Sequence, residues 1–182
     1  MFDRLGFSTT YFVAINKLVL EQFGTDIGNL TMPKLVRWEA RKLITPRQGV
    51  IYVRSKSGPS FSDDLLHGAW GGATVTFLAL QAAFFMGFKE VFLIGVDHNF
   101  QTQGNPHEEI TAKGPDTDHF TPEYFGEGTR WHLPDLKTSE VAYQLAKDRF
   151  EAAGRRVVDA TLGGKLRVFP KVDYLSVLAG KT

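Results

Sequence analysis

The chain contains no cysteine, which excludes disulfides, thiolate nucleophiles and cysteine-ligated metal centres. It also lacks an excess of either charge: 21 basic and 20 acidic residues give a formal net charge of +1 at pH 7. This balance provides neither the broad basic field that nucleic-acid binding requires nor an acidic one. The lack of cysteine fits a reducing compartment, so we expect a cytoplasmic protein with no nucleic-acid partner.

Long apolar runs are missing as well. The apolar run over residues 75–88 is too short to cross a bilayer, contains Gln81 and is followed by Lys89 and Glu90. The first residues lack the basic region, apolar stretch and cleavage site of a signal peptide. We therefore expect no membrane span and no secretion. The length of 182 residues, 43% of them hydrophobic, predicts a single domain over residues 1–182.

A continuous apolar segment organises the chain. A helix is predicted from about Ala73 to Met86, and because apolar residues occupy nearly every face of it, it must be buried. Gly87 ends this helix where a residue with positive φ is preferred. A strand is predicted over residues 91–96. Its unbroken apolar run is typical of a strand covered on both faces, near the middle of a parallel sheet.

Strands and helices alternate along the rest of the chain. We expect strands at residues 10–15, 34–38, 49–53 and 155–160, and helices at residues 17–23, 138–153 and 172–178. Residues 99–136 are irregular but rich in aromatics, which argues for a packed lid and against disorder. The alternation predicts an α/β fold, a Rossmann-like, doubly wound and mostly parallel sheet.

In open α/β sheets, ligands bind beyond the carboxyl ends of the strands. Residues 97–99 and Asn16 fall at such ends. Gly71 and Gly72 precede the central helix, where free N–H groups attract anions and a phosphate can approach the backbone. We expect these residues to share one pocket under the lid. The alternative is that the glycines form a plain tight turn and Asp97 only holds a loop.

Three segments resemble the MptE-like family, which is named after an archaeal 6-hydroxymethylpterin diphosphokinase. They are residues 86–97 (MGFKEVFLIGVD), 118–125 (DHFTPEYF) and 159–170 (DATLGGKLRVFP). The helix–strand segment and residues 20–23 are also similar to bacterial sialyltransferases, which use a CMP-activated donor and share a Rossmann-like fold. The resemblance covers nearly the whole chain and implies a nucleotide held across the carboxyl edge of the sheet.

The resemblance also implies which residues face that nucleotide. The matching positions are Asn16, Gly71, Gly72, Ala73, Thr74, Asp97 and Asn99. Two departures stand out. Fuller family members begin with a strand and a glycine-containing loop that this sequence does not show, so the resemblance implies a chain without the first βα unit. The sialyltransferases carry a histidine general base a few residues beyond the position of His119, where this chain has Glu123 or Tyr124. Both departures are compatible with lost or altered catalysis.

Attack of a hydroxyl on a nucleotide-activated sugar needs a general base and donors for the leaving phosphate. His119 is the first candidate for the base, ahead of His98 and His132, although a structural or solvated role is the alternative for any single histidine. Tyr124 and Arg130 are the candidates for the phosphate.

Carboxylates that could hold Mg²⁺ are present but match no known metal loop, so we expect no metal site. They are Asp97, Glu108, Glu109, Asp116 and Asp118.

Three functions follow from these residues. The first is a sialyltransferase-like glycosyltransferase in surface polysaccharide or glycoconjugate synthesis, with a nucleotide-activated sugar as substrate, no tightly bound cofactor, and a small-molecule or glycan acceptor. The second is a pterin-type diphosphokinase, which predicts dependence on ATP and Mg²⁺. The third is a non-catalytic nucleotide or sugar-nucleotide binding domain. The sequence leaves the oligomeric state open.

Overall fold

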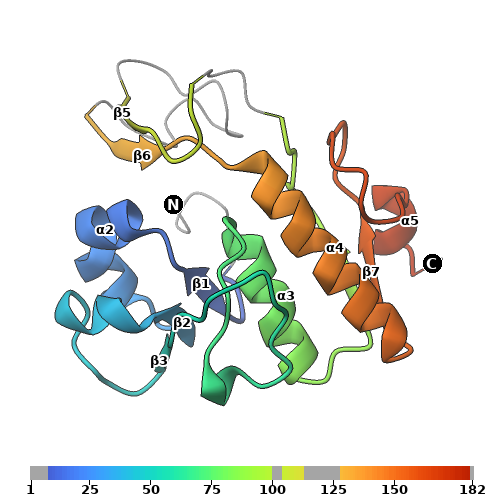
Figure 1. Ribbon diagram of the computed structural model, residues 1–182. Helices are drawn as coiled ribbons and strands as arrows, with labels where there is room; N and C mark the ends of the chain where they lie inside the picture. Colours follow the sequence, from blue (N-terminus) through green and yellow to red (C-terminus); the bar gives the residue numbers. More distant parts are fainter. Residues whose placement is uncertain (1–7, 100–103, 113–127, 181–182) are drawn as a thin grey trace.

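The structure is a computed structural model that describes residues 8–99, 104–112 and 128–180 (Figure 1). Its strands are β1 (Phe12–Ala14), β2 (Lys34–Arg37), β3 (Val50–Val53), β4 (Glu90–Leu93), β5 (Glu109–Thr111), β6 (Arg130–His132) and β7 (Arg156–Asp159). Its helices are α2 (Lys17–Asn29), α3 (Val75–Phe85), α4 (Leu136–Ala152) and α5 (Tyr174–Leu178), with short 3₁₀ turns η1 (Trp38–Lys42) and η2 (Leu65–His67). The predicted α/β class is confirmed.

The parallel strands are divided between two sheets. One has the order β1–β2–β3, and the other is the pair β4–β7. The prediction that residues 91–96 lie near the middle of one sheet is wrong, because β4 ends at Leu93 and pairs with β7 alone among the described strands. Beyond Leu93 the chain leaves the sheet: Ile94 is 59% exposed and Gly95 has a φ of +72°.

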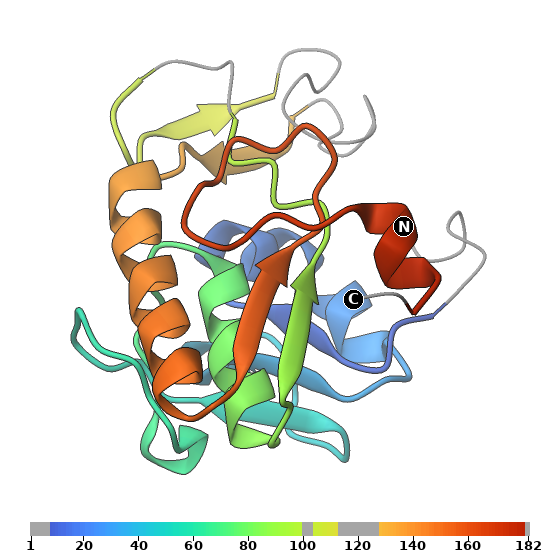
Figure 2. The same ribbon diagram turned by 90° about the vertical axis from the view of Figure 1, so that its right-hand side faces the viewer.

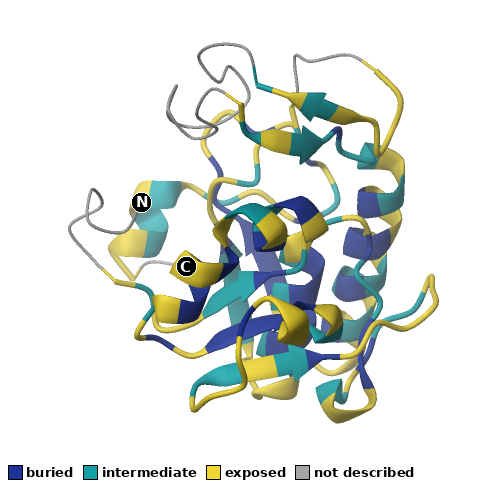
Figure 3. Cartoon of the chain, turned by 90° about the vertical axis from the view of Figure 1, so that its left-hand side faces the viewer, coloured by how far each residue is buried: buried dark blue, intermediate teal, exposed yellow. Residues whose placement is uncertain are grey.

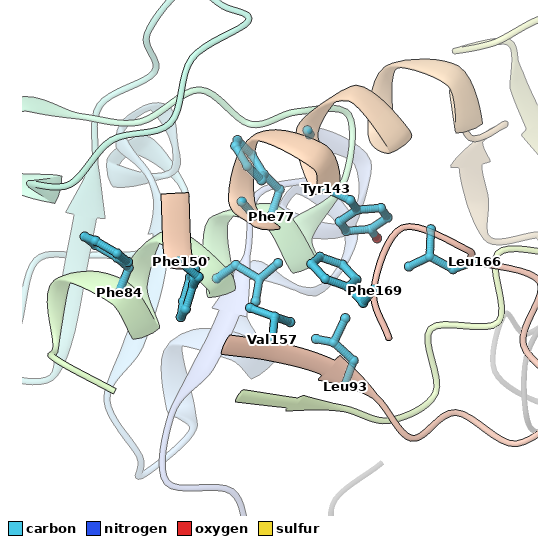
Figure 4. Packing of buried hydrophobic residues seen from close by; sticks show 11 residues of the cluster. Phe77, Phe84, Leu93, Tyr143, Phe150, Val157, Leu166 and Phe169 are labelled. Carbon is cyan, nitrogen blue, oxygen red and sulfur yellow. The ribbon is translucent and has the colours of Figure 1, made fainter. Parts of the chain in front are cut away.

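Helix α3 packs against both parallel sheets. Leu78 and Ala82 lie in a core cluster with residues of β2 and β3. Phe77, Leu80 and Phe84 lie in a second cluster with residues of α4, β4 and β7 (Figure 4). Each buried side chain of this size contributes roughly 1.5–3 kcal/mol. This helix is apolar on nearly every face because one side packs against β2 and β3 and another side packs against α4, β4 and β7.

The ends of α3 lie within two residues of the predicted bounds. Thr74 caps the start, with its Oγ1 accepting a hydrogen bond from the N–H of Thr76 at 3.3 Å. At the other end the N–H of Gly87 donates to Phe84 O at 3.0 Å, and the N–H of Phe88 donates to Ala83 O at 3.1 Å. This Schellman pattern needs a left-handed residue, and Gly87 has a φ of +87°.

Helix α2 and the η1 turn cover the face of the β1–β2–β3 sheet opposite α3. Leu20 and Ile27 of α2 and Ala40 of η1 share a cluster with Ala14 and Val36 of the sheet. This sheet therefore lies between two helical layers, and Figure 3 shows buried residues on its strands and exposed residues on the outer turns of the helices.

The prediction that α2 stops at Gly24 is wrong, because the helix continues to Asn29. Gly24 and Gly28 face the segment that follows η1, at a distance where a Cβ would make ordinary van der Waals contact. A Cβ at Gly24 would lie 3.5 Å from Leu43 Cβ, and one at Gly28 would lie 3.5 Å from Ile44 Cγ2.

The β4–β7 pair is covered by α3 and α4 on one face. Figure 2 shows its other face toward the viewer, where the described residues include no helix that crosses it as α2 crosses the first sheet. On β4, Phe92 is half-buried, and Ile94 beyond it is exposed. The two parallel sheets are thus enclosed to different degrees.

The described part of the predicted lid is the antiparallel hairpin β5–β6, which is fixed to α2. Gln22 Nε2 donates to Arg130 O at 2.8 Å, and Gln22 Oε1 accepts from the N–H of Arg130 at 2.8 Å. One side-chain amide of α2 thus satisfies the backbone of β6 as a neighbouring strand would. Within the described residues, no helix has the length and apolar character needed to span a membrane.

Candidate functional site

A hollow of about 200 Å³, here called the inner hollow, lies at the carboxyl ends of β1, β2 and β3. It is lined by Ile15, Arg37, Val53, Arg54, Ser55, Ala69, Gly71 and Leu78. Each of the three strands contributes its last residue or the residues that follow it, and Gly71 comes from the turn that leads into α3. The lining combines five apolar or glycine residues with Ser55 and two arginines, Arg37 and Arg54.

A second hollow of about 370 Å³, the outer hollow, lies between α2 and η1. It is lined by Lys17, Leu20, Glu21, Arg37, Glu39, Ala40, Lys42 and Leu43. Arg37 lines both hollows, so the two are neighbours along the same edge of the sheet. Together, the two hollows are lined by both apolar and charged residues.

Cations outnumber anions around the two hollows, with Arg37, Arg54, Lys17 and Lys42 against Glu21 and Glu39. Arg37 Nε donates to Glu39 Oε2 at 2.9 Å, and this hydrogen bond lowers the pKa of the Glu39 carboxyl. A guanidinium has five N–H donors, so Arg37 keeps others for a bound anion. The edge suits a ligand with negative charge.

Trp38, directly after β2, holds two arginines at this edge. The guanidinium carbon of Arg41 lies 4.5 Å from the Trp38 ring centroid, and that of Arg54 lies 5.2 Å from it. Tyr52 packs edge-on against the same ring at 6.2 Å. Such cation–π contacts are worth about 0.5–1 kcal/mol at exposed sites. They restrict the otherwise exposed Arg54 to a position beside the inner hollow.

The two predicted glycines have different roles. Gly71 lines the inner hollow. Gly72 is buried with a φ of +58°, and a Cβ on it would lie 2.5 Å from Ala142 Cβ and 2.6 Å from Phe77 Cδ1. Gly72 is therefore required for close packing of the turn against α4. For this residue the structure favours the tight-turn interpretation over contact with a ligand.

Asn16 and Thr74 act as helix caps. Asn16 Oδ1 accepts from the N–H of Leu18 at 2.9 Å, which satisfies the start of α2. Thr74 caps α3, and its Oγ1 also lies 3.2 Å from the hydroxyl of Tyr143. Both side-chain oxygens are therefore engaged within the protein. Ala73, between Gly72 and Thr74, is exposed and has a left-handed backbone with a φ of +57°.

Asp97 and Asn99 lie beyond the carboxyl end of β4, and both are exposed. The backbone carbonyl of Asp97 accepts from the N–H of Lys165 at 2.7 Å, which joins this loop to the turn after β7. Neither residue lines the inner or the outer hollow. His98, which lies between Asp97 and Asn99, is the residue of this segment whose side chain packs toward the start of α3.

The side chain of His98 is 8% exposed, its Nε2 lies 2.9 Å from Glu140 Oε1, and its ring packs at 6.2 Å against the ring of Tyr143. Tyr143 is 3% exposed, and burial raises the pKa of its phenol. Through the contact of Tyr143 with Thr74, the loop after β4 is joined to the start of α3. From the sequence, His98 is expected to be a weaker candidate for the base than His119.

The remaining predicted residues are only partly described. His119 and Tyr124 lie outside the described residues. Arg130 is exposed on β6, where its Nη1 lies 3.2 Å from Glu109 Oε1 and its Nη2 lies 3.5 Å from Glu21 Oε2. Arg130 therefore ties the hairpin to α2 and approaches the outer hollow only through Glu21.

The described carboxylates do not gather around a common point. Among the residues described, no group of three or more histidine, aspartate or glutamate side chains could hold a metal ion. Glu108 Oε2 accepts from the N–H of Asn105 at 3.0 Å, and Glu109 pairs with Arg130.

Sequence reasoning missed Arg37, Arg54 and Glu140. The two arginines stand at the ends of predicted strands, so the rule applied to Asp97 would also have identified them.

Comparisons with models of protein families, with curated proteins and with solved structures found no match. The interpretation of the site therefore depends on its geometry.

Proposed function

We propose that this chain is a nucleotide-dependent transferase that binds a nucleotide-activated sugar at the carboxyl edge of the β1–β2–β3 sheet. The observation that carries the proposal is the placement of Arg37 and Arg54 at the ends of adjacent parallel strands, beside a hollow that also includes Gly71. Guanidinium groups bind phosphate oxygens through paired, charge-assisted hydrogen bonds. The donor phosphate would lie over Arg37, at the junction of the two hollows.

The sizes and linings of the hollows support an orientation for the donor. The outer hollow is the larger, and its apolar lining of Leu20, Ala40 and Leu43 suits the flat face of a nucleobase. The inner hollow extends to Gly71, so the activated sugar would lie toward the start of α3. In this orientation the bond to be broken faces the turn that holds Ala73 and Thr74.

We also propose that the chain has a Rossmann-like fold and belongs to the MptE-like family. Parallel strands, helices on both faces of the first sheet and a ligand edge at the strand ends support this arrangement.

Ligand-dependent stabilisation tests the proposal. The free energy of unfolding should rise with CMP or a CMP-activated sugar in the absence of metal, by about 2.7 kcal/mol at 100 times the Kd. Arg37→Gln and Arg54→Gln should each weaken binding roughly 10- to 100-fold, because a charged hydrogen bond contributes about 1.5–3 kcal/mol. Arg41→Gln is the matched control, since Arg41 contacts the same Trp38 ring but lines neither hollow.

The alternatives give different results in the same assay. Stabilisation by ATP only in the presence of Mg²⁺ would favour a diphosphokinase. Stabilisation by CMP without turnover would favour a binding domain. Equal loss of binding in all three arginine variants would contradict the placement of the phosphate.

A further inference from the structure

Backbone strain is concentrated beside the start of α3. Among the described residues outside glycine, left-handed φ values occur at Ala73, His98 and His107. The first two lie on either side of the Tyr143–Thr74 contact, and Gly72 next to Ala73 is left-handed as well. Strained residues persist only where the surrounding structure determines them, and they cluster at functional sites. The strain therefore marks the region between the α3 start and the loop after β4.

The contact with Glu140 defines the state of the His98 ring. A carboxylate can only accept a hydrogen bond, so at 2.9 Å the Nε2 of His98 must donate to Glu140 Oε1. In the neutral ring this leaves Nδ1 with a free lone pair. No described residue forms a hydrogen bond with His98 Nδ1.

His98 differs from the other histidines that lie near a carboxylate. His67 Nδ1 lies 2.8 Å from Asp64 Oδ2, but both side chains are exposed, at 78% and 43%. His107 lies 3.5 Å from Asp135 and is 66% exposed. The largely buried His98 ring is fixed by Tyr143 on its side and by Glu140 at Nε2. A histidine that a carboxylate holds at one ring nitrogen is the arrangement of a general base and its orienting group.

We propose that His98 is the general base of the transfer and that Glu140 is its positioning residue. This inference rests on the proposed function. The hydroxyl of the acceptor gives its proton to His98 Nδ1 while its oxygen forms a bond to the anomeric carbon of the sugar. The bond between that carbon and the phosphate oxygen breaks, and its electron pair leaves with the nucleotide. Glu140 stabilises the resulting imidazolium. The acceptor is therefore a compound with a free hydroxyl group.

Nucleotide release from a CMP-activated sugar, with lactose as the hydroxyl acceptor, tests this role. His98→Gln should lower kcat at least 100-fold while the KM for the donor changes less than about twofold. Glu140→Gln should lower kcat about 10-fold while the KM for the donor changes less than about twofold, because the ring loses the carboxylate that orients it. His67→Gln, which alters the exposed histidine–carboxylate pair, should leave both constants unchanged.

Three outcomes would overturn the inference. They are equal turnover by His98→Gln and His67→Gln, parallel loss of donor binding and turnover in His98→Gln, and no turnover by the unaltered protein. Glu140 is 56% exposed, so Glu140→Gln keeps the test valid if His98→Gln fails to fold. The proposed function fails separately, when CMP and CMP-activated sugar do not stabilise the unaltered protein.

Discussion

The two parallel sheets contact the same helix, α3, but are enclosed differently. The β1–β2–β3 sheet has α2 and η1 on one face and α3 on the other, and its carboxyl edge carries the arginines of the two hollows. The β4–β7 pair has α3 and α4 on one face, and the loop at its carboxyl edge carries the strained His98. The β1–β2–β3 sheet therefore has cations at its carboxyl edge and is covered on both faces. The loop after β4 is strained, and its His98 is fixed by contacts with Tyr143 and Glu140.

This difference suggests a division of roles between the two sheets. Binding of a phosphate needs cations in fixed positions, which a sheet covered on both faces can supply. Proton transfer needs one side chain held at a specific angle, and Tyr143 and Glu140 of α4 hold His98 in this way. The start of α3 joins the two regions, since Gly71 lines the inner hollow and Thr74 contacts Tyr143. Substitutions at this junction test the comparison most directly.

The largest effect on stability is expected for Gly72→Ala. The new methyl group would lie 2.5 Å from Ala142 Cβ, and the φ of +58° would force alanine into a strained backbone. Overpacking of 1–3 kcal/mol and left-handed strain of 1–2 kcal/mol predict a loss of roughly 3 kcal/mol in the free energy of unfolding, measured by urea denaturation. Gly71→Ala is the control, because its Cβ would lie 3.4 Å from Ile15 Cδ1. Similar losses in both variants would show that the junction is not tightly packed against α4.

A smaller effect is expected at the start of α4, on the side of the second sheet. Asp135 caps this helix, and its hydrogen bonds with the side chain and N–H of Thr138 lower the pKa of its carboxyl. A depressed pKa means that the stabilisation is present above the unfolded value of about 3.9 and is lost as the pH falls through the folded value. Asp135→Ala should cost about 1 kcal/mol at pH 7.

Asp135→Asn separates the cap from the charge. Asparagine caps a helix about as well as aspartate but does not titrate, so this variant should lose less stability than the original protein between pH 7 and pH 2. Urea denaturation at several pH values measures the difference. If the two proteins show the same dependence on pH, the Asp135 carboxylate contributes nothing beyond its hydrogen-bonding geometry.

Features that depend on neighbouring residues in the sequence were predicted well. The end of α3 at Gly87 follows from local hydrogen-bonding rules, so it could be found without knowledge of the partners of this helix. Gly24 shows the limit of such rules. The prediction ended α2 at residue 23, but the helix continues through Gly24 to Asn29, because Leu20 and Ile27 on either side of the glycine are buried against the sheet. Those tertiary contacts are not visible in the local sequence.

The site was predicted only in outline for the same reason. The rule that ligands bind at strand ends directed attention to residues 97–99, but it could not say which of the three side chains is buried. His98 turns inward because its ring packs on Tyr143 and pairs with Glu140, both from a helix that follows much later in the chain. Arg37 and Arg54 could have been found by the same rule, since they lie at the ends of β2 and β3, but only the fold shows that the two line one hollow.

The smallest effect, and the one that best separates strain from packing, is expected for Ala73→Gly. Ala73 is exposed with a φ of +57°, so glycine removes strain without removing a buried contact. Relief of the strain outweighs the greater chain entropy of glycine, and the free energy of unfolding should rise by about 0.5 kcal/mol. Ala79→Gly, in the middle of α3, should instead lower it by about 1 kcal/mol. If the strain at residue 73 holds the turn for donor binding, Ala73→Gly should be more stable in urea and yet bind CMP more weakly. A variant that gains stability with unchanged affinity would show that the strain serves packing alone.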